Sequence, residues 1–225
     1  MAAGRGGAGV SGQHRYIVVE GPIGVGKTTL ARRLAESLQG RLLLEAAHEN
    51  PFLERFYRNP RQAALPTQLH FLLQRAEQLR ALEQDDLFDQ VCVGDFLMDK
   101  DRLFAELNLD ADELGIYQDV YRHLAVAVPP PDLVVYLQAP VPVLRERIER
   151  RGIEFERGMD GGYLQQLADA YMRFFHDYAD APVLIVNAAA INFADSDDDF
   201  AALLTQIERT HNGRHFFNPS PLANL

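Results

Sequence analysis

The sequence predicts an α/β fold in which a five-stranded parallel sheet is flanked by helices. Three observations support this fold class. Short β-branched runs alternate with longer helical stretches, which is typical of parallel strands joined by crossover helices. A glycine-rich loop lies between the first of these runs and the first helical stretch, and the length of 225 residues suits one compact domain.

The expected elements follow one another along the chain. We expect strands over residues 16–20, 41–45, 91–95, 133–137 and 183–186. We expect helices after residue 27 and over residues 66–83, 112–126, 141–151 and 161–178. The prolines at positions 129 to 131 separate one helix from the next strand, since proline cannot continue a helix. The acidic run 195–199 lacks the spaced ligands and central glycine of a calcium loop, so we expect a solvated cap before a last helix.

Composition limits the domain organisation and the partners. We expect a disordered leader over residues 1–14, one domain over residues 15–210 and a C-terminal tail over residues 211–225. The 22 Lys and Arg residues face 32 Asp and Glu residues, and the net charge of −10 disfavours nucleic acid and anionic lipid as partners. The chain has a single cysteine, Cys92, and no apolar run of the ~20 residues that a membrane span needs. We therefore expect a cytoplasmic protein without disulfides.

The glycine-rich loop fits the P-loop pattern, because Gly-Pro-Ile-Gly-Val-Gly-Lys-Thr occupies residues 21–28 between a strand and a helix. The glycines allow successive backbone N–H groups to surround phosphates, Lys27 reaches the β and γ oxygens, and Thr28 can hold Mg²⁺. The residues expected to bind ATP are Gly21, Pro22, Ile23, Gly24, Val25, Gly26, Lys27, Thr28 and Thr29.

A P-loop alone does not distinguish kinases from GTPases or motor ATPases. The Asn-Lys-x-Asp motif that reads guanine in GTPases is absent, and 225 residues leave little room for the partner domains of a motor. These two observations favour a P-loop kinase.

Two acidic residues end predicted strands beside the P-loop. The carboxyl ends of the strands in such a sheet point into one crevice, so Glu45 is placed to accept a proton from an attacking hydroxyl. Asp95 is placed to hold the water shell of Mg²⁺. The alternative for either acid is that it caps the helix or loop that follows.

Four segments carry a resemblance to a known family. They are residues 20–29, residues 50–57 (Asn-Pro-Phe-Leu-Glu-Arg-Phe-Tyr), Pro-Thr-Gln at 66–68 with Arg75, and Tyr-Leu-Gln-Ala-Pro at 136–140. With these segments the chain resembles the deoxynucleoside kinase family from Tyr16 to about Ile207, and especially its bacterial deoxyadenosine and deoxyguanosine kinase branch. The resemblance implies transfer of the γ-phosphoryl group of ATP to the 5′-hydroxyl of a deoxynucleoside, with Mg²⁺, and it implies a homodimer.

The resemblance also implies roles for residues around the reacting groups. Glu45 matches the catalytic base of the family, while Tyr57 and Glu156 match the residues that bind the sugar 3′-hydroxyl. Arg147 and Arg151 match the arginines of a short lid that clamp the donor phosphates. The neighbouring Arg150 and Arg157 are expected to be solvated.

Base recognition is implied for three further residues. Gln68 lies eleven residues after Tyr57, Arg75 follows seven residues later, and both intervals agree with the family. The alternative for this pair is an ordinary polar helix face. Asp101 matches the aspartate that reads the base, and the three together are expected to select deoxyadenosine first and deoxyguanosine second.

One departure from the family concerns the residues after the third predicted strand. Many relatives have Glu-Arg-Ser there, whereas this chain has Gly94, Asp95 and Phe96, and either Lys100 or Arg102 is the candidate for the missing positive charge.

Two other functions stay open. A nucleoside monophosphate kinase such as thymidylate kinase would need a cation where Phe96 stands, and an ATP-dependent binding module would lack the acceptor-side acids.

Overall fold

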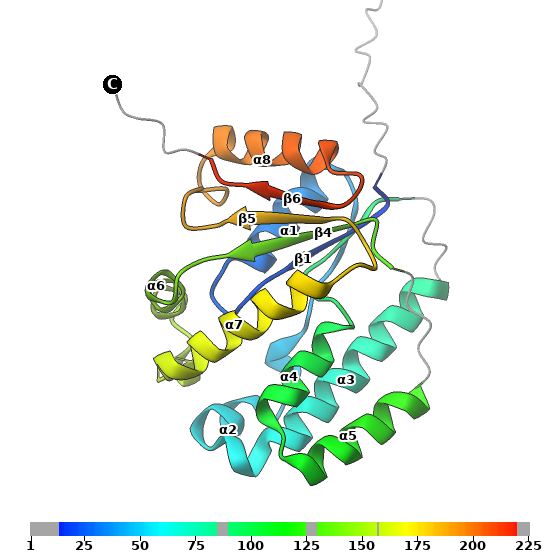
Figure 1. The fold of residues 1–225 in the computed structure, drawn as a ribbon, viewed down its shortest axis with the longest axis vertical. Coiled ribbons are helices and arrows are strands. Elements are labelled where there is room, and N and C mark those ends of the chain that lie inside the picture. Colours follow the sequence, from blue (N-terminus) through cyan, green and yellow to red (C-terminus); the bar gives the residue numbers. More distant parts are fainter. Residues whose placement is uncertain (1–13, 85–89, 125–129, 157, 220–225) are drawn as a thin grey trace, which may run out of the picture.

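A six-stranded parallel sheet with the strand order β2-β3-β1-β4-β5-β6 lies between two layers of helices in the computed structural model (Figure 1). The structure describes residues 14–84, 90–124, 130–156 and 158–219, so the expected leader lies almost wholly outside the described residues. The strands are β1 (Tyr16–Glu20), β2 (Arg41–Leu43), β3 (Cys92–Gly94), β4 (Leu133–Gln138), β5 (Val183–Asn187) and β6 (Arg214–Phe217).

Helices connect the strands as the sequence predicts, although the helices Leu53–Arg58 and Lys100–Asn108 were not expected. They are α1 (Lys27–Ser37), α2 (Leu53–Arg58), α3 (Pro60–Gln84), α4 (Lys100–Asn108), α5 (Ala111–Leu124), α6 (Val141–Arg151), α7 (Gly161–Asp177) and α8 (Asp197–Arg209), with short 3-10 turns at Ala47–Glu49 and Glu154–Glu156. The last part of the predicted helix 112–126 lies outside the described residues.

The prediction of five strands is wrong, because β6 pairs in parallel with β5, with Arg214 opposite Val183. This strand falls in the segment predicted as a C-terminal tail. Its first three residues are exposed, so it has neither the apolar run nor the alternation by which a strand is recognised in sequence. Strands β2 and β3 are also shorter than predicted, which places Glu45 two residues beyond β2 and Asp95 directly after β3.

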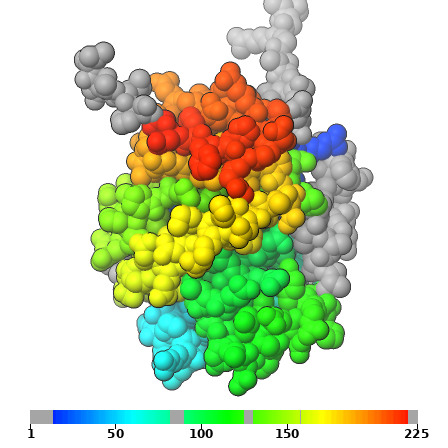
Figure 2. Space-filling model, in the orientation of Figure 1, coloured from blue at the N-terminus to red at the C-terminus, as the bar shows by residue number. Residues whose placement is uncertain are grey.

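Two apolar clusters hold the helices on opposite faces of the sheet. Helices α1 and α8 pack on one face around Leu30, Leu34 and Leu203, all fully buried. Helices α3, α4, α5 and α7 pack on the other face (Figure 1). Figure 2 shows α7, in yellow, crossing the surface between the β6–α8 region and α4 with α5.

Three local features differ from or agree with the expectation. Helix α3 begins at Pro60 and continues through Pro66, although a proline inside a helix removes one backbone hydrogen bond. Cys92 is a free, buried cysteine, as expected for a small apolar residue. The acidic run lies at the start of a helix, as expected: residues 197–199 form the first turn of α8, and the Ser196 hydroxyl accepts a hydrogen bond from Asp199 N at 3.2 Å. Among the described helices, none is long and apolar enough to span a membrane.

Candidate active site at the carboxyl ends of the strands

A cleft of about 650 Å³ opens where the central strands end. Its walls come from the P-loop, the Glu45 loop, helices α2 and α3, and the α6–α7 region. The predicted site residues that line it are Ile23, Gly24, Val25, Gly26, Lys27, Thr28, Thr29, Glu45, Tyr57, Gln68, Arg75, Asp95, Arg147, Arg151 and Glu156. Segments far apart in the sequence therefore meet at one site.

The P-loop needs its glycines for conformation and for space. Gly21, Gly24 and Gly26 have φ values of 147°, 83° and 107°, which L side chains rarely adopt. A Cβ atom at Gly21 would also lie 2.4 Å from the carbonyl oxygen of Leu137 in β4. The loop consequently wraps closely against β4 while α1 begins directly behind it, at Lys27.

The side chain of Lys27 is held in place by backbone carbonyl groups of the P-loop. Its Nζ donates hydrogen bonds to the carbonyl oxygens of Gly21 at 2.8 Å and Pro22 at 3.3 Å. Burial lowers the pKa of Lys27, and the nearby positive charge of Lys100 lowers it further. The lysine is thus a preoriented cation for which a phosphate is a fitting partner.

Thr28 and Asp95 form the second part of the donor side. The Thr28 hydroxyl donates to Asp95 Oδ2 at 2.6 Å, and Asp95 Oδ1 accepts from the backbone N–H of Glu45 at 2.7 Å. A hydroxyl and a carboxylate are hard oxygen ligands of the kind that Mg²⁺ uses together with phosphate and water. No three His, Cys, Asp or Glu residues cluster as a metal site in the described part of the chain, and this pair fits an ion that is bound mainly by nucleotide and water.

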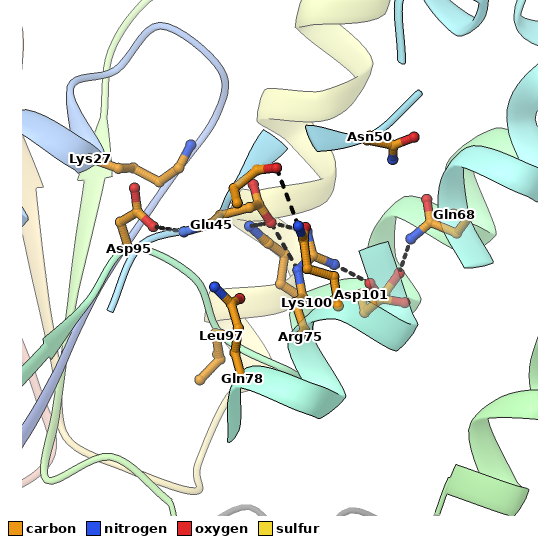
Figure 3. Close-up of polar contacts among 12 residues, drawn as sticks. Lys27, Glu45, Asn50, Gln68, Arg75, Gln78, Asp95, Leu97, Lys100 and Asp101 are labelled. Carbon is orange, nitrogen blue, oxygen red and sulfur yellow. Dashed lines mark hydrogen bonds and ion pairs between the residues drawn. The ribbon is translucent and has the colours of Figure 1, made fainter. Parts of the chain in front are cut away.

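Glu45 lies between the donor side and helix α3, as Figure 3 shows. Its Oε1 accepts from Arg75 Nε at 2.8 Å and from Arg75 Nη2, and Lys100 Nζ lies 3.6 Å away. Burial alone would raise the pKa of Glu45, but the charges of Arg75 and Lys100 outweigh it and lower the pKa to about 2. Every hydrogen bond and ion pair found for this carboxylate within the described residues goes to Oε1, which leaves Oε2 for a ligand.

Arg75 connects Glu45 to Asp101. Its Nη1 pairs with Asp101 Oδ1, while the Tyr117 hydroxyl from α5 donates to Asp101 Oδ2 at 2.6 Å. Asp101 is fully buried and is not among the cleft residues, so it reaches the cleft only through Arg75 and Gln68. Gln68 Nε2 donates to the backbone oxygen of Asp101 at 3.1 Å, so one N–H and Oε1 of this amide remain for a ligand.

The opposite end of the cleft brings the predicted sugar and lid residues together. Tyr57 of α2 stacks on Phe155, with ring centroids 5.7 Å apart. Glu156 is buried, and its Oε2 pairs with Arg151 at the end of α6. Two residues predicted for different substrates, Arg151 and Glu156, therefore contact each other.

The remaining lid arginines behave differently from one another. Arg147 donates to the carbonyl oxygens of Val25 at 2.9 Å and Ala188 at 2.7 Å, so it bridges the P-loop to the segment after β5. Burial lowers the pKa of Arg147, and Arg150 adds to this effect. Arg150 is exposed, as expected of a solvated residue, and it also lines the cleft, whereas Arg157 lies outside the described residues.

Several residues of the site escape sequence reasoning. Residues 191–194 after β5 form one wall of the cleft, and no motif marks them. Glu20 and Tyr117 are buried behind the cleft, and their contacts, such as that of the Tyr117 hydroxyl with Asp101, depend on the fold and cannot be read from the sequence. Of the two candidates for the missing charge, Lys100 is buried beside Glu45, whereas the exposed Arg102 pairs with Glu106 at 3.5 Å.

Comparisons with known proteins show the family to which the chain belongs. A family model described as deoxynucleoside kinase matches residues 17–211. The chain is 32% identical to the deoxyguanosine kinase of Bacillus subtilis over 86% of this chain and 96% of that one. It is 26% identical to the deoxyadenosine/deoxycytidine kinase of the same organism, over 87% and 92% of the two chains. A structure of deoxyadenosine kinase from M. mycoides with products dCMP and dCDP has a similar fold, with a TM-score of 0.75, 22% identity and coverage of 86% and 99%.

Proposed function

Because this chain belongs to the deoxynucleoside kinase family, we propose that its cleft transfers the γ-phosphoryl group of ATP to the 5′-hydroxyl of a purine deoxynucleoside. The observation that carries the proposal is the placement of Glu45. Its backbone N–H donates to Asp95, which also accepts from Thr28, and its carboxylate accepts from Arg75 of α3. A hydroxyl bound there would meet a proton acceptor and a phosphate donor at once.

The donor side would bind ATP through the P-loop. Residues 23–29 line the cleft and would supply backbone N–H groups, and Lys27 would supply a charge for the β and γ oxygens. Thr28 and Asp95 would hold Mg²⁺, which when bound neutralises charge on the β and γ phosphates. Arg147 and Arg151 would add positive charge from the lid side.

The acceptor side would bind a neutral nucleoside. Glu45 would orient the 5′-hydroxyl and accept its proton, and Tyr57 and Glu156 would bind the sugar 3′-hydroxyl. The low pKa of Glu45, about 2, keeps it ionised at neutral pH. A weak base suffices for phosphoryl transfer, because the loose transition state depends mainly on positioning and on charge stabilisation.

Base selection would depend on helix α3. Gln68 keeps one N–H and its Oε1 for a ligand, and that pair of groups matches the donor and acceptor edge of adenine. Arg75 keeps further N–H donors for an oxygen such as that of guanine. Relatives that act on deoxyguanosine and on deoxyadenosine support a purine, with deoxyadenosine proposed first.

One transfer assay tests the proposal. Labelled phosphate from ATP is followed onto each of the four deoxynucleosides and each of their 5′-monophosphates. We expect purine deoxynucleosides to be the best acceptors, deoxycytidine to be weaker and monophosphates to be poor. Thymidine as the best acceptor would refute the purine assignment, a monophosphate as the best acceptor would indicate a nucleoside monophosphate kinase, and no acceptor at all would indicate a binding module. A homodimer and a cytoplasmic location stay predictions from sequence.

A further inference from the structure

The segment that carries Glu45 lies beyond the end of a strand. Strand β2 ends at Leu43, whose carbonyl oxygen accepts a hydrogen bond from the backbone N–H of Asp95 at 3.1 Å. Residues 44–46 follow β2 without pairing to a strand, and Glu45 lines the cleft. Partly buried carbonyl oxygens that have left a sheet need other donors, because an unpaired backbone group is costly to bury. The position of Glu45 therefore depends on what holds its neighbours.

Helix α3 supplies these donors from one face. Gln78 Nε2 donates to the carbonyl oxygen of Leu44, the residue before Glu45, at 2.9 Å. Gln74 Nε2 donates to the carbonyl oxygen of the residue after Glu45 at 3.4 Å. Arg75 binds the carboxylate of Glu45 itself, and Figure 3 shows Arg75 and Gln78 rising from α3 towards this segment. One helix therefore holds three consecutive residues.

The spacing of the contacts on the helix agrees with their spacing on the segment. The two glutamines are one helical turn apart, and four residues of an α-helix rise about 6 Å. Leu44 and Ala46 are two residues apart, and two residues of backbone can span up to about 7 Å. Both amide groups can therefore meet both carbonyl oxygens at once. A slip of the segment by one residue would move the Glu45 carboxylate away from Arg75, so the contacts fix the register.

Gln78 makes the shorter of the two glutamine contacts and has no second partner. Gln74 divides its donor between Ala46 and the exposed Glu49, whose Oε2 lies at 3.2 Å. Within the described part of the chain, Gln78 Nε2 donates only to Leu44, and its buried Oε1 has no hydrogen-bond partner. A carbonyl oxygen only accepts, which fixes the NH₂ group of Gln78 towards Leu44. Neither glutamine lines the cleft, so any effect on catalysis must pass through the segment that they hold.

We propose that Gln78, assisted by Gln74, is a positioning residue that holds the backbone on either side of Glu45 and thereby sets where its carboxylate meets the acceptor hydroxyl. The proposal rests on the proposed function, because it deepens the role given there to Glu45. Its structural content, the placement of residues 44–46, does not depend on any substrate. A misplacement of about 1 Å can cost about 100-fold in rate, so a contact outside the cleft can control turnover.

The replacement of Gln78 by methionine tests the proposal, because methionine keeps the length of the side chain and removes the donor. We expect kcat of Gln78→Met to fall about 10- to 100-fold, with KM for ATP and for deoxyadenosine within a few-fold of the parent. Gln62→Met is the matched control, since it makes the same change at an exposed residue of α3 that does not line the cleft, and it should match the parent. A folded Gln78→Met enzyme with the parental kcat would overturn the proposal.

A double mutant separates positioning from a general loss of structure. If Gln78 acts through Glu45, adding Gln78→Met to Glu45→Gln should lower kcat by less than about threefold further, because the carboxylate that it positions is already absent. A general weakening of the fold would lower kcat by the same factor in both backgrounds, and that result would overturn the proposal. If Gln78→Met does not fold, Gln74→Met is measured in the same two backgrounds, where equal falls, or no fall at all, would overturn it.

Hydrogen exchange without substrate distinguishes a failure of this inference from a failure of the proposed function. The backbone N–H of Glu45 donates to Asp95 at 2.7 Å, so it exchanges slowly only while the segment keeps its place. We expect faster exchange over residues 44–49 in Gln78→Met and parental exchange in Gln62→Met. Parental exchange in Gln78→Met would overturn the inference even if the chain transfers phosphate. Faster exchange in a chain that transfers none would support the placement of the segment and refute only the proposed function.

Discussion

The replacement of Glu45 by glutamine tests the core of the site, because it changes one carboxylate oxygen to an amide and keeps the shape. We expect kcat to fall by about 10²- to 10⁴-fold, which corresponds to about 2.7 to 5.4 kcal/mol of lost transition-state stabilisation. The glutamine oxygen can still accept from Arg75, so deoxynucleoside affinity should change little.

The same replacement has a stability cost that the assay must separate from the chemistry. The folded pKa of Glu45, about 2, lies below the ordinary value of 4.5. A depressed pKa means that the ionised group stabilises the fold above pH 4.5 and that this contribution is lost as pH falls towards 2. The difference is worth about 3 kcal/mol at neutral pH, or a fall in Tm of roughly 6 to 12 °C.

Steady-state transfer from ATP should therefore be measured well below the Tm of the variant, with folding verified by circular dichroism. Glu49→Gln is the matched control, since it makes the same chemical change at an exposed residue that does not line the cleft. A Glu45→Gln enzyme whose kcat stays within a few-fold of the parent would refute the assignment of Glu45 as the base.

Three further predictions follow from the geometry. Hydrogen exchange over residues 147–156 should slow when ATP and deoxynucleoside are added together, and Arg151→Ala should lower kcat more than deoxynucleoside affinity; unchanged exchange would argue against a lid. Asp101→Asn should change the ranking of kcat/KM among the four deoxynucleosides by about ten- to a hundred-fold, because the Asp101 carboxylate holds Arg75 in the cleft; an unaltered ranking would contradict this. Gly21→Ala should abolish ATP binding in calorimetry, since its Cβ would lie 2.4 Å from a backbone oxygen of β4, and normal binding would show that the loop is not the nucleotide site.

The parts of the fold that the sequence predicts are those with strong local signals. Strands β1, β4 and β5 are continuous apolar runs buried on both faces, and the P-loop has a fixed spacing. Strand β6 and helices α2 and α4 escaped prediction because each is short and packs against a neighbour, β5 for the strand and α3 for the two helices. The helix predicted to start at Pro66 starts at Pro60 instead. Packing of α3 against α2 outweighs the one backbone hydrogen bond that Pro66 removes.

The site shows the same division between local and tertiary signals. Glu45 and Asp95 could be found because they follow strands, and Lys27 and Thr28 because they belong to a motif. The sequence offered both Lys100 and Arg102 for the missing charge, and only the direction in which α4 faces distinguishes them. The burial of Asp101 behind Arg75 could not be read from spacing either, because it depends on how α3, α4 and α5 pack.

The double attachment of Arg75 has a consequence for how this enzyme can diversify. The Arg75 guanidinium contacts Glu45, the acid proposed to act on the acceptor hydroxyl. It also contacts Asp101, which is buried behind the residues proposed to bind the base. A substitution at Arg75 that altered the preferred base would disturb turnover in the same step, so this position resists change under selection for a new substrate. Gln68 carries no such contact with Glu45, and it lies two helical turns away on α3. New base preferences should therefore evolve first at Gln68 and at its neighbours in the cleft, with Arg75 retained as a shared support for every substrate.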